Sequence, residues 1–274
     1  MVFGEGLAVR TYDVPLPGLD DCGGGVRIAH VSDFHFRRWN DLLDQVRWRL
    51  LQPDYDLLVV TGDLCSIPAK WRHAANMCRR LFDGIAPPLG TYAVMGNHDR
   101  PRLARQPGLP FRWLDNEHVC IKVKGLSLYL AGVDQSEGKF GDAGAALSGV
   151  PADGPVVMLA HYPSTVFDLA SDRVGLVLSG HTHGGQIRLP GIGCLFTNDR
   201  IPTRMSRGLH RVGGTRVHVS AGIGMSGPIH CRFRCPPEIT FLTLTTIDSN
   251  VGESTARVPS GHKRSRAREL VLEV

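Results

Sequence analysis

Aspartate, asparagine and histidine side chains follow directly after five apolar runs of the sequence, and residues of these types can bind metal ions. The stretch LVLSGHTHGGQIRLP, residues 176–190, shows the pattern, because an apolar run ends in His181 and His183 and two glycines follow. Together the five runs supply Asp33, His35, Asp63, Asn97, His98, Asp99, His161, His181 and His183. A single residue of this kind after a strand is usually a helix cap or a turn residue. Five runs that all end in such residues indicate a shared site.

The residue types predict the class of metal and the class of reaction. Oxygen and imidazole ligands without cysteine suit borderline divalent ions such as Mn²⁺, Fe²⁺ or Zn²⁺. Alternate side chains of an extended chain point the same way, so Asp33 with His35, and His181 with His183, can each serve one cluster. A carboxylate that bridges two ions spaced about 3.5–4 Å apart gives a centre that activates water and stabilises both oxygens of an in-line displacement. Glycines beside the ligands allow tight turns and the close approach of a substrate oxyanion.

The elements that position these residues alternate between strands and helices in the first half of the chain. Apolar runs predict strands at 26–32, 56–61 and 90–95, and apolar residues three and four apart predict helices at 40–51 and 71–83. Strands then follow one another more closely, with a hairpin at 119–133 and runs at 155–160, 174–179, 215–221 and 238–245. This order predicts an α/β sandwich with a mixed sheet core. Open α/β sheets bind their ligands at the carboxyl ends of the strands, where the metal-ligand residues stand.

Composition and charge narrow the class of protein. The 274 residues are 42% hydrophobic and 21% charged, as in an ordinary globular protein. A net charge of +5 favours an anionic substrate or surface but is weaker than in most nucleic-acid binders. Seven cysteines, an odd number, predict reduced side chains rather than a disulfide framework. Because neither a signal peptide nor a transmembrane run is recognisable, we expect a cytoplasmic protein. The oligomeric state is not indicated.

We expect one catalytic domain over residues 1–247 and a basic, flexible tail over residues 248–274. The tail contains HKRSRAR at 262–268. Its four cationic side chains can supply roughly 1 kcal/mol each at an anionic leaflet, which predicts loose, salt-sensitive contact with the inner membrane. The alternative is a solvated end without a partner.

The blocks DFH, GD, GNHD, AHYP and GHTH, in this order, resemble the calcineurin-like metallophosphoesterase superfamily over Arg27 to Thr245. The strings SGHTHGGQIRLP, AGVDQ and CPPEI are similar to a bacterial branch of membrane-associated phosphodiesterases, some of which cleave the pyrophosphate of UDP-2,3-diacylglucosamine in lipid A synthesis. The resemblance implies a four-layer αββα sandwich and two divalent ions, with Mn²⁺ preferred over Zn²⁺, Fe²⁺ or Mg²⁺. It also implies attack by a metal-bound hydroxide on a phosphodiester or pyrophosphate bond of a small-molecule or lipid-linked substrate.

The same resemblance assigns a role to each site residue. The implied ligands are Asp33, His35 and His183 for the first ion, Asn97, His161 and His181 for the second, and Asp63 between both. His98 is expected to protonate the leaving oxygen, with Asp99 orienting its ring. Members of the branch commonly begin with a membrane helix or an export signal, and neither is recognisable in this sequence. They also often carry an acidic residue shortly after the GD block, where Leu64, Cys65 and Ser66 stand here.

Several residues near these blocks allow two interpretations. Arg100 and Arg102, together with Arg105, follow GNHD, and guanidinium groups match phosphate oxygens, so they are predicted substrate contacts unless they belong to a solvated loop. Phe111 and Trp113 are expected to pack in the core rather than to face a lipid chain. The histidines inside strand-like runs are expected to be packed, and these are His30, His118 and His218.

Three functions compete. The first is a phosphodiesterase or pyrophosphatase, and the second is a nuclease or a phosphomonoesterase that uses the same site. An aromatic content of 7% with a charge of +5 argues against a groove that binds nucleic acid, so we expect no nucleic-acid partner. The third is a scaffold without catalytic activity, which the complete set of ligands argues against.

Overall fold

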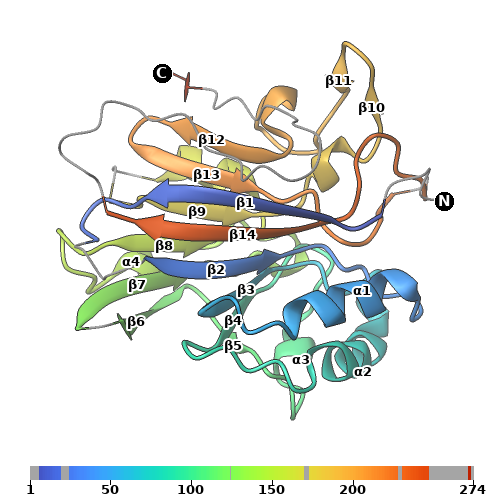
Figure 1. The fold of residues 1–274 in the computed structure, drawn as a ribbon, viewed down its shortest axis with the longest axis horizontal. Coiled ribbons are helices and arrows are strands. Elements are labelled where there is room, and N and C mark those ends of the chain that lie inside the picture. Colours follow the sequence, from blue (N-terminus) through green and yellow to red (C-terminus); the bar gives the residue numbers. More distant parts are fainter. Residues whose placement is uncertain are drawn as a thin grey trace.

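Two mixed β-sheets lie face to face at the centre of the molecule in the computed structural model (Figure 1). The structure describes residues 6–19, 25–123, 125–169, 173–227, 230–246 and 271–272. The strands of the first sheet are β1 Ala8–Pro15, β2 Val26–Val31, β3 Leu57–Thr61, β4 Thr91–Val94, β5 Arg112–Trp113 and β14 Glu238–Thr245. Within the described residues they are ordered β1-β14-β2-β3-β4-β5.

The second sheet contains most of the later strands. They are β6 Glu117–Val123, β7 Leu126–Gly132, β8 Val156–Leu159, β9 Leu176–Ser179, β12 Gly208–Val212, β13 Thr215–Val219 and β15 Val271–Leu272. Their order in space is β15-β12-β13-β9-β8-β7-β6. A separate two-stranded hairpin is formed by β10 Arg188–Leu189 and β11 Gly193–Cys194.

Parallel strands carry the site in both sheets. In the first sheet β2, β3, β4 and β5 run parallel to one another. In the second sheet β13, β9, β8 and β7 are parallel in the same way. The outer strand β1 pairs in parallel along its whole length with β14, which is antiparallel to β2. Both sheets therefore present a row of carboxyl strand ends at one edge.

Four α-helices are found within the described residues: α1 Asp41–Leu50, α2 Trp71–Phe82, α3 Pro101–Ala104 and α4 Ala143–Leu147. Helix α1 begins at Asn40, whose side-chain oxygen accepts the Leu43 N–H, and Asp41 and Asp44 stand in its first turn near the positive end of the helix dipole. Helix α2 buries one face, formed by Ala74, Ala75, Met77, Cys78, Leu81 and Phe82.

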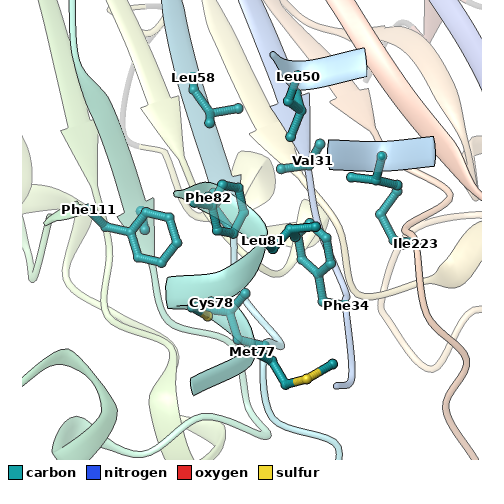
Figure 2. Packing of buried hydrophobic residues seen from close by; sticks show 14 of the residues in the cluster. Val31, Phe34, Leu50, Leu58, Met77, Cys78, Leu81, Phe82, Phe111 and Ile223 are labelled. Carbon is teal, nitrogen blue, oxygen red and sulfur yellow. The ribbon is translucent and has the colours of Figure 1, made fainter. Parts of the chain in front are cut away.

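Three hydrophobic clusters separate the layers. Side chains on one face of the first sheet, such as Val31 and Leu58, pack against Leu50 of α1 and Leu81 and Phe82 of α2 (Figure 2). The opposite face of that sheet packs against the second sheet. A third cluster covers the outer face of the second sheet, where α4 contacts β6 and β7. The layers are therefore helix, sheet, sheet and helix, and the α/β sandwich predicted from the sequence is confirmed.

Most predicted elements are present, and the differences lie at the periphery. The helices predicted at 40–51 and 71–83 are α1 and α2, and Phe111 packs in the core beside Trp113 as expected. The sequence did not predict β1, β5, β12 or the β10–β11 hairpin. The tail predicted over 248–274 lies outside the described residues apart from β15, so its flexibility remains a prediction.

None of the helices in the described parts of the chain has the length and apolar character that crossing a bilayer requires.

Candidate metal centre

The ligand residues meet because parallel strands of both sheets end at the same place. Asp33, Asp63 and Asn97 come just after β2, β3 and β4, which are neighbours in the first sheet. His161 and His181 come just after β8 and β9, which are neighbours in the second sheet. The stacked sheets therefore bring polar loops from sequence positions far apart into one cluster.

Two groups of three side chains form within the described residues. In each group the donor atoms lie within 4.8 Å of one another, and the groups are Asp33, His35 and His183, and Asp63, His161 and His181. The Asp63 carboxylate lies between them, since its Oδ2 is 3.4 Å from His35 Nε2 in the first group and 3.3 Å from His161 Nε2 in the second. Both groups are almost entirely buried.

The hydrogen bonds of the imidazoles show that the groups fit divalent cations. His35 Nδ1 donates to the Cys65 carbonyl at 3.1 Å, and His161 Nδ1 donates to the Thr61 carbonyl at 2.8 Å. A carbonyl only accepts, so in a neutral ring Nε2 keeps its lone pair. Both lone pairs then face Asp63 Oδ2, which is also an acceptor. A cation placed between these electron-rich atoms would stabilise them at such short distances. Histidines that bind metal ions also commonly donate their other ring N–H to a backbone carbonyl, which fixes the orientation of the ring.

The second histidine pair extends the same arrangement. His183 Nε2 lies 3.1 Å from His35 Nε2 and 3.4 Å from Asp33 Oδ1. His181 Nε2 donates a hydrogen bond to the Asn198 carbonyl at 3.0 Å. In a neutral ring this leaves the lone pair of Nδ1 free to bind a metal ion. The backbone N–H of His181 also donates to Asp33, so the two groups share a hydrogen bond.

Asn97 and His98 reach the cluster from the loop after β4. Asn97 Oδ1 lies 3.1 Å from His161 Nε2, so it is placed with the second group. The His98 N–H donates to Asp63 Oδ1 at 2.9 Å, and its ring packs edge-on against His35 with 5.0 Å between the centroids. His98 Nδ1 has no hydrogen-bond partner. The ring therefore stands beside the cluster without belonging to either group.

The structure does not give Asp99 the predicted contact with the His98 ring. Asp99 is fully buried, and its carboxylate accepts the Cys65 N–H at 2.9 Å and the Gly96 N–H at 3.1 Å. The side chain points back into the protein, because two backbone amides compete successfully for its oxygens. Asp99 thus ties the loop after β4 to the loop after β3, and its effect on His98 is indirect.

Arg100 and Arg102 stand at the start of α3, beyond the metal groups. With Arg105 they line a depression of about 400 Å³ that also contains Trp71 and Glu137. Arg100 Nη1 pairs with Glu137 Oε1 at 2.9 Å. The three arginines therefore lie together, and one of them is paired with a carboxylate.

Backbone strain is concentrated at the ligands. Ten non-glycine residues have positive φ within the described residues, and half of them are ligand candidates, namely Asp33, His35, Asp63, His181 and His183. Such residues are uncommon and cost about 1–3 kcal/mol each, so they persist where the surroundings hold them in place, often at functional sites.

The glycine pair after His183 has a steric role. Gly184 and Gly185 have φ values of 61° and 78°. A Cβ atom on Gly184 would lie 2.6 Å from Cys235 Sγ, and one on Gly185 would overlap Cys194 Sγ. The loop can turn beneath the two histidines only because these side chains are absent.

Burial is the largest influence on the ionisation of the cluster. It lowers the pKa of His35 and of His181 to about 4, so both rings are neutral at neutral pH. Burial raises the pKa of Asp33 to about 7. Although burial opposes the charge on Asp63, the His161 and His35 rings lower its pKa below the ordinary range. Burial likewise opposes a charge on His161, but the Asp63 carboxylate raises its pKa to about 10, so Asp63 favours a positive charge at this position, which a divalent ion would supply.

The sequence did not identify several groups that support the ligands. The carbonyls of Thr61, Cys65 and Asn198 orient imidazoles, and backbone atoms leave no signal in the residue types. Arg232 is 1% exposed and donates to the carbonyls of Ala221, Gly222, Gly224 and Cys235. The Gly224 N–H in turn donates to the Asp33 carbonyl, so Arg232 braces the loop behind that ligand. In the sequence nothing distinguishes it from Arg234.

Several known proteins are similar to this chain in sequence. The calcineurin-like phosphoesterase family matches residues 26–185. The chain is 32% identical to an uncharacterized metallophosphoesterase of Aquifex aeolicus over 254 residues, 87% of this chain and 92% of that protein. It is 28% identical to phosphodiesterase YaeI of Escherichia coli, over 80% of this chain and 82% of that protein. A Bos taurus transmembrane protein with metallophosphoesterase domain is 32% identical, over 86% of this chain and 57% of that protein. The chain therefore belongs to the calcineurin-like phosphoesterase family and is a metal-dependent phosphoester hydrolase.

Proposed function

We propose that the protein hydrolyses a phosphodiester or pyrophosphate bond at a centre of two divalent ions. The position of Asp63 carries the proposal, because one carboxylate oxygen lies 3.4 Å from a ligand atom of the first group and 3.3 Å from one of the second. A carboxylate between two histidine-rich groups is suited to bridging two ions. The phosphodiesterase name of the Escherichia coli relative supports a diester substrate.

We assign the ligands as follows. The first ion is held by Asp33, His35 and His183, the second by Asn97, His161 and His181, and Asp63 is shared. When bound, the ions neutralise charge on the phosphoryl oxygens and lower the pKa of water. Because the ligands combine carboxylate, amide and imidazole without a thiolate, we propose Mn²⁺ as the ion used.

His98 is the proposed general acid. Its backbone is fixed by the bond to Asp63, and its ring lies against His35 without joining either metal group. Its Nδ1 atom is buried without a hydrogen-bond partner, which leaves Nε2 as the ring atom proposed to carry the proton. The ring is therefore placed to donate a proton to the leaving oxygen.

The proposed substrate is nucleotide-linked or lipid-linked, with UDP-2,3-diacylglucosamine as the example to be tested. The resemblance of the strings around GHTH to membrane-associated phosphodiesterases supports it. Arg100 and Arg102 are proposed to contact a second phosphate, since the depression that they line with Arg105 is rich in guanidinium groups. We take residues 1–247 as the catalytic domain and 248–274 as the tail, and propose a cytoplasmic protein that binds the inner membrane peripherally.

Asp63→Ala tests the dinuclear centre. Elemental analysis of the wild-type protein should find two divalent ions per chain, and the variant should lose both or bind them in disordered fashion. Activity should be measured on bis-p-nitrophenyl phosphate, p-nitrophenyl phosphate, UDP-2,3-diacylglucosamine and single-stranded DNA. Asp153→Ala, at an exposed position away from both groups, is the matched control and should keep metal and activity. A fully active protein with a single tightly bound ion would refute the proposal.

A further inference from the structure

A cluster of exposed apolar side chains projects from the molecule next to the metal centre. The β10–β11 hairpin stands away from the two large sheets at the upper right of Figure 1. Leu189, Ile192, Leu195 and Phe196 are exposed on the hairpin and just after it, with Ile192 and Phe196 each 69% exposed. Phe233 joins them at the base, where its carbonyl accepts the Arg188 N–H at 3.0 Å. We call these five side chains the apolar tip.

The apolar tip is unusual for a protein surface. Five of the eleven large apolar side chains that are exposed in the described parts of the chain belong to it. Exposed apolar residues are common singly, but a contiguous group marks a surface that binds a partner or a membrane. Both aromatic and branched aliphatic side chains are present, which suits a lipid interface better than the stacked bases of a nucleic acid.

Arginines surround the base of the apolar tip. Residues 181–237 contain eight arginines and a single acidic residue, Asp199. Arg188 Nη1 donates to Ser206 Oγ at 2.7 Å, and Arg207 Nη1 donates to the Arg234 carbonyl at 3.3 Å, so these side chains lie near one another. Arg204 stands in the turn Thr203–Met205, which contacts β11. We call Arg188, Arg204, Arg207 and Arg234 the arginine collar.

The surface next to the apolar tip borders the metal centre at Asn198. Residues 195–203 line an open depression of about 620 Å³, and both Leu195 and Phe196 of the tip form part of it. Asn198 lies in the same depression, and its carbonyl accepts the His181 Nε2–H at 3.0 Å. One residue therefore joins this surface to a proposed ligand of the second ion.

The positive charge of the arginine collar favours an anionic bilayer over a second copy of the chain as the partner of the apolar tip. A second copy of the chain packed symmetrically on this patch would bring two arginine collars together, and like charges repel. An anionic bilayer offers apolar chains for the tip and phosphates for the collar at the same time.

We propose that the apolar tip inserts into the interface of an anionic bilayer, that the arginine collar binds lipid phosphates, and that the substrate is a membrane lipid with a phosphodiester or pyrophosphate. The tip and collar fix the orientation of the protein, so a headgroup reaches the metal centre through the depression lined by residues 195–203. The substrate part of this inference rests on the proposed function. The membrane part does not.

Sedimentation of the full chain with vesicles tests the inference. The wild-type protein should bind vesicles of phosphatidylcholine and phosphatidylglycerol at low salt, and bind phosphatidylcholine alone weakly. Ile192→Ser/Phe196→Ser should reduce binding at least about tenfold, since two large apolar side chains no longer leave water. Arg204→Gln/Arg234→Gln should reduce binding to anionic vesicles and weaken its dependence on salt. Arg204→Gln/Arg234→Gln should hydrolyse bis-p-nitrophenyl phosphate at the wild-type rate, and both variants should lose activity on a phospholipid substrate in vesicles.

Matched controls come from other surfaces. Trp48→Ser on α1 removes a side chain that is 66% exposed, and Arg72→Gln removes an exposed charge on α2. Both should bind vesicles like the wild type.

Undiminished binding of Ile192→Ser/Phe196→Ser would overturn the inference. The inference would also be overturned if the wild-type protein formed a dimer and bound no vesicles, and if Ile192→Ser/Phe196→Ser converted that dimer to a monomer. Loss of binding only when Lys263, Arg264, Arg266 and Arg268 are changed to Gln would assign the membrane contact to the tail instead. Inactivity of the wild type on every phosphodiester would refute the proposed function but leave the sedimentation result intact.

Discussion

At the scale of single residues, metal binding and proton transfer can be separated at His98. The ring lies next to the cluster but in neither metal group, so His98→Gln should retain two ions. Loss of a general acid typically costs about 10²–10⁴-fold, and an alkoxide leaving group needs the proton far more than p-nitrophenolate does. We therefore expect hydrolysis of an alkyl phosphodiester to fall by that factor, and hydrolysis of bis-p-nitrophenyl phosphate to fall much less.

The hydrolysis rates of wild type and His98→Gln should be measured on both substrates, and the metal content of the same preparations should be determined by elemental analysis. Equal losses with both ions retained would mean that His98 stabilises charge on the phosphoryl oxygens. Loss of an ion would make His98 a ligand.

Asp99→Asn should give a different pattern from His98→Gln. Its carboxylate accepts two backbone N–H groups, and an asparagine amide can accept only on its oxygen side, which leaves one buried donor without a partner. A destabilisation of about 1–3 kcal/mol is expected. Urea unfolding should show it, and activity should fall to the same extent on both substrates. A selective loss on the alkyl substrate would mean that Asp99 does act through the His98 ring.

The candidate ligands could be found from the sequence because strand ends and ligand-type residues coincide, and both are visible in the order of residues. The direction in which the Asp99 side chain points could not be predicted from the sequence. His98 and Asp99 are neighbours in the chain, and only the packing of the Cys65 and Gly96 amides shows that the carboxylate is already used. For the same reason Arg232, which braces the loop behind Asp33, could not be told from the exposed Arg234.

At the scale of elements, the junction between β9 and His181 has no space for a side chain. A Cβ atom on Gly180 would overlap Ser32 Oγ and Asp33 Oδ2 in the loop after β2. Gly180→Ala should therefore displace Asp33 and reduce the metal content to about one ion per chain, with loss of most activity. Elemental analysis and the rate on bis-p-nitrophenyl phosphate measure the effect.

Gly144→Ala in α4 is the matched control for that change. A Cβ atom there would meet only Asp142 Oδ1 at 3.3 Å, and alanine favours the helix. It should keep both ions. Two ions and wild-type activity in Gly180→Ala would show that the loops move apart without consequence for the site.

Buried strands were predictable as elements, and edge elements were not. Among the parallel strands that precede the ligands, β3 and β8 are almost entirely apolar, with the sequences LLVVT and VVML, as is typical of strands covered on both faces. In contrast, β1 alternates half-buried and exposed positions and contains Arg10 and Asp13, so its sequence AVRTYDVP does not stand out. The β10–β11 hairpin has only two residues per strand, too few for a periodic signal.

At the scale of the whole molecule, a buried histidine pair joins the two sheets. His30 of β2 and His218 of β13 are fully buried, with 3.0 Å between their Nδ1 atoms. Burial lowers the pKa of His30 to about 3, and it lowers that of His218 well below the ordinary value of 6.5. Below pH 6.5 the unfolded chain binds protons that the folded chain does not, so the free energy of unfolding falls as the pH falls from 6.5 toward 3.

Each of the two histidines should contribute about 1.4 kcal/mol per pH unit to that slope. His218→Leu removes one of them and leaves every metal ligand in place. Urea unfolding of both proteins at several pH values below neutrality should show the smaller slope in the variant, whatever its absolute stability. Equal slopes would mean that His218 remains protonated inside the fold.

The pairing of β1 with β14 determines when the site can be completed. Arg10 of β1 bonds Glu238 of β14 across 228 residues, and β14 also separates β1 from β2. Such long-range contacts raise the contact order and slow folding, because most of the chain must be closed into a loop before they form. During synthesis the strand that carries Asp33 lacks one neighbour until residues 238–245 have emerged. Loading of metal ions is therefore expected to be among the last events in the biogenesis of the protein rather than a nucleus for its folding.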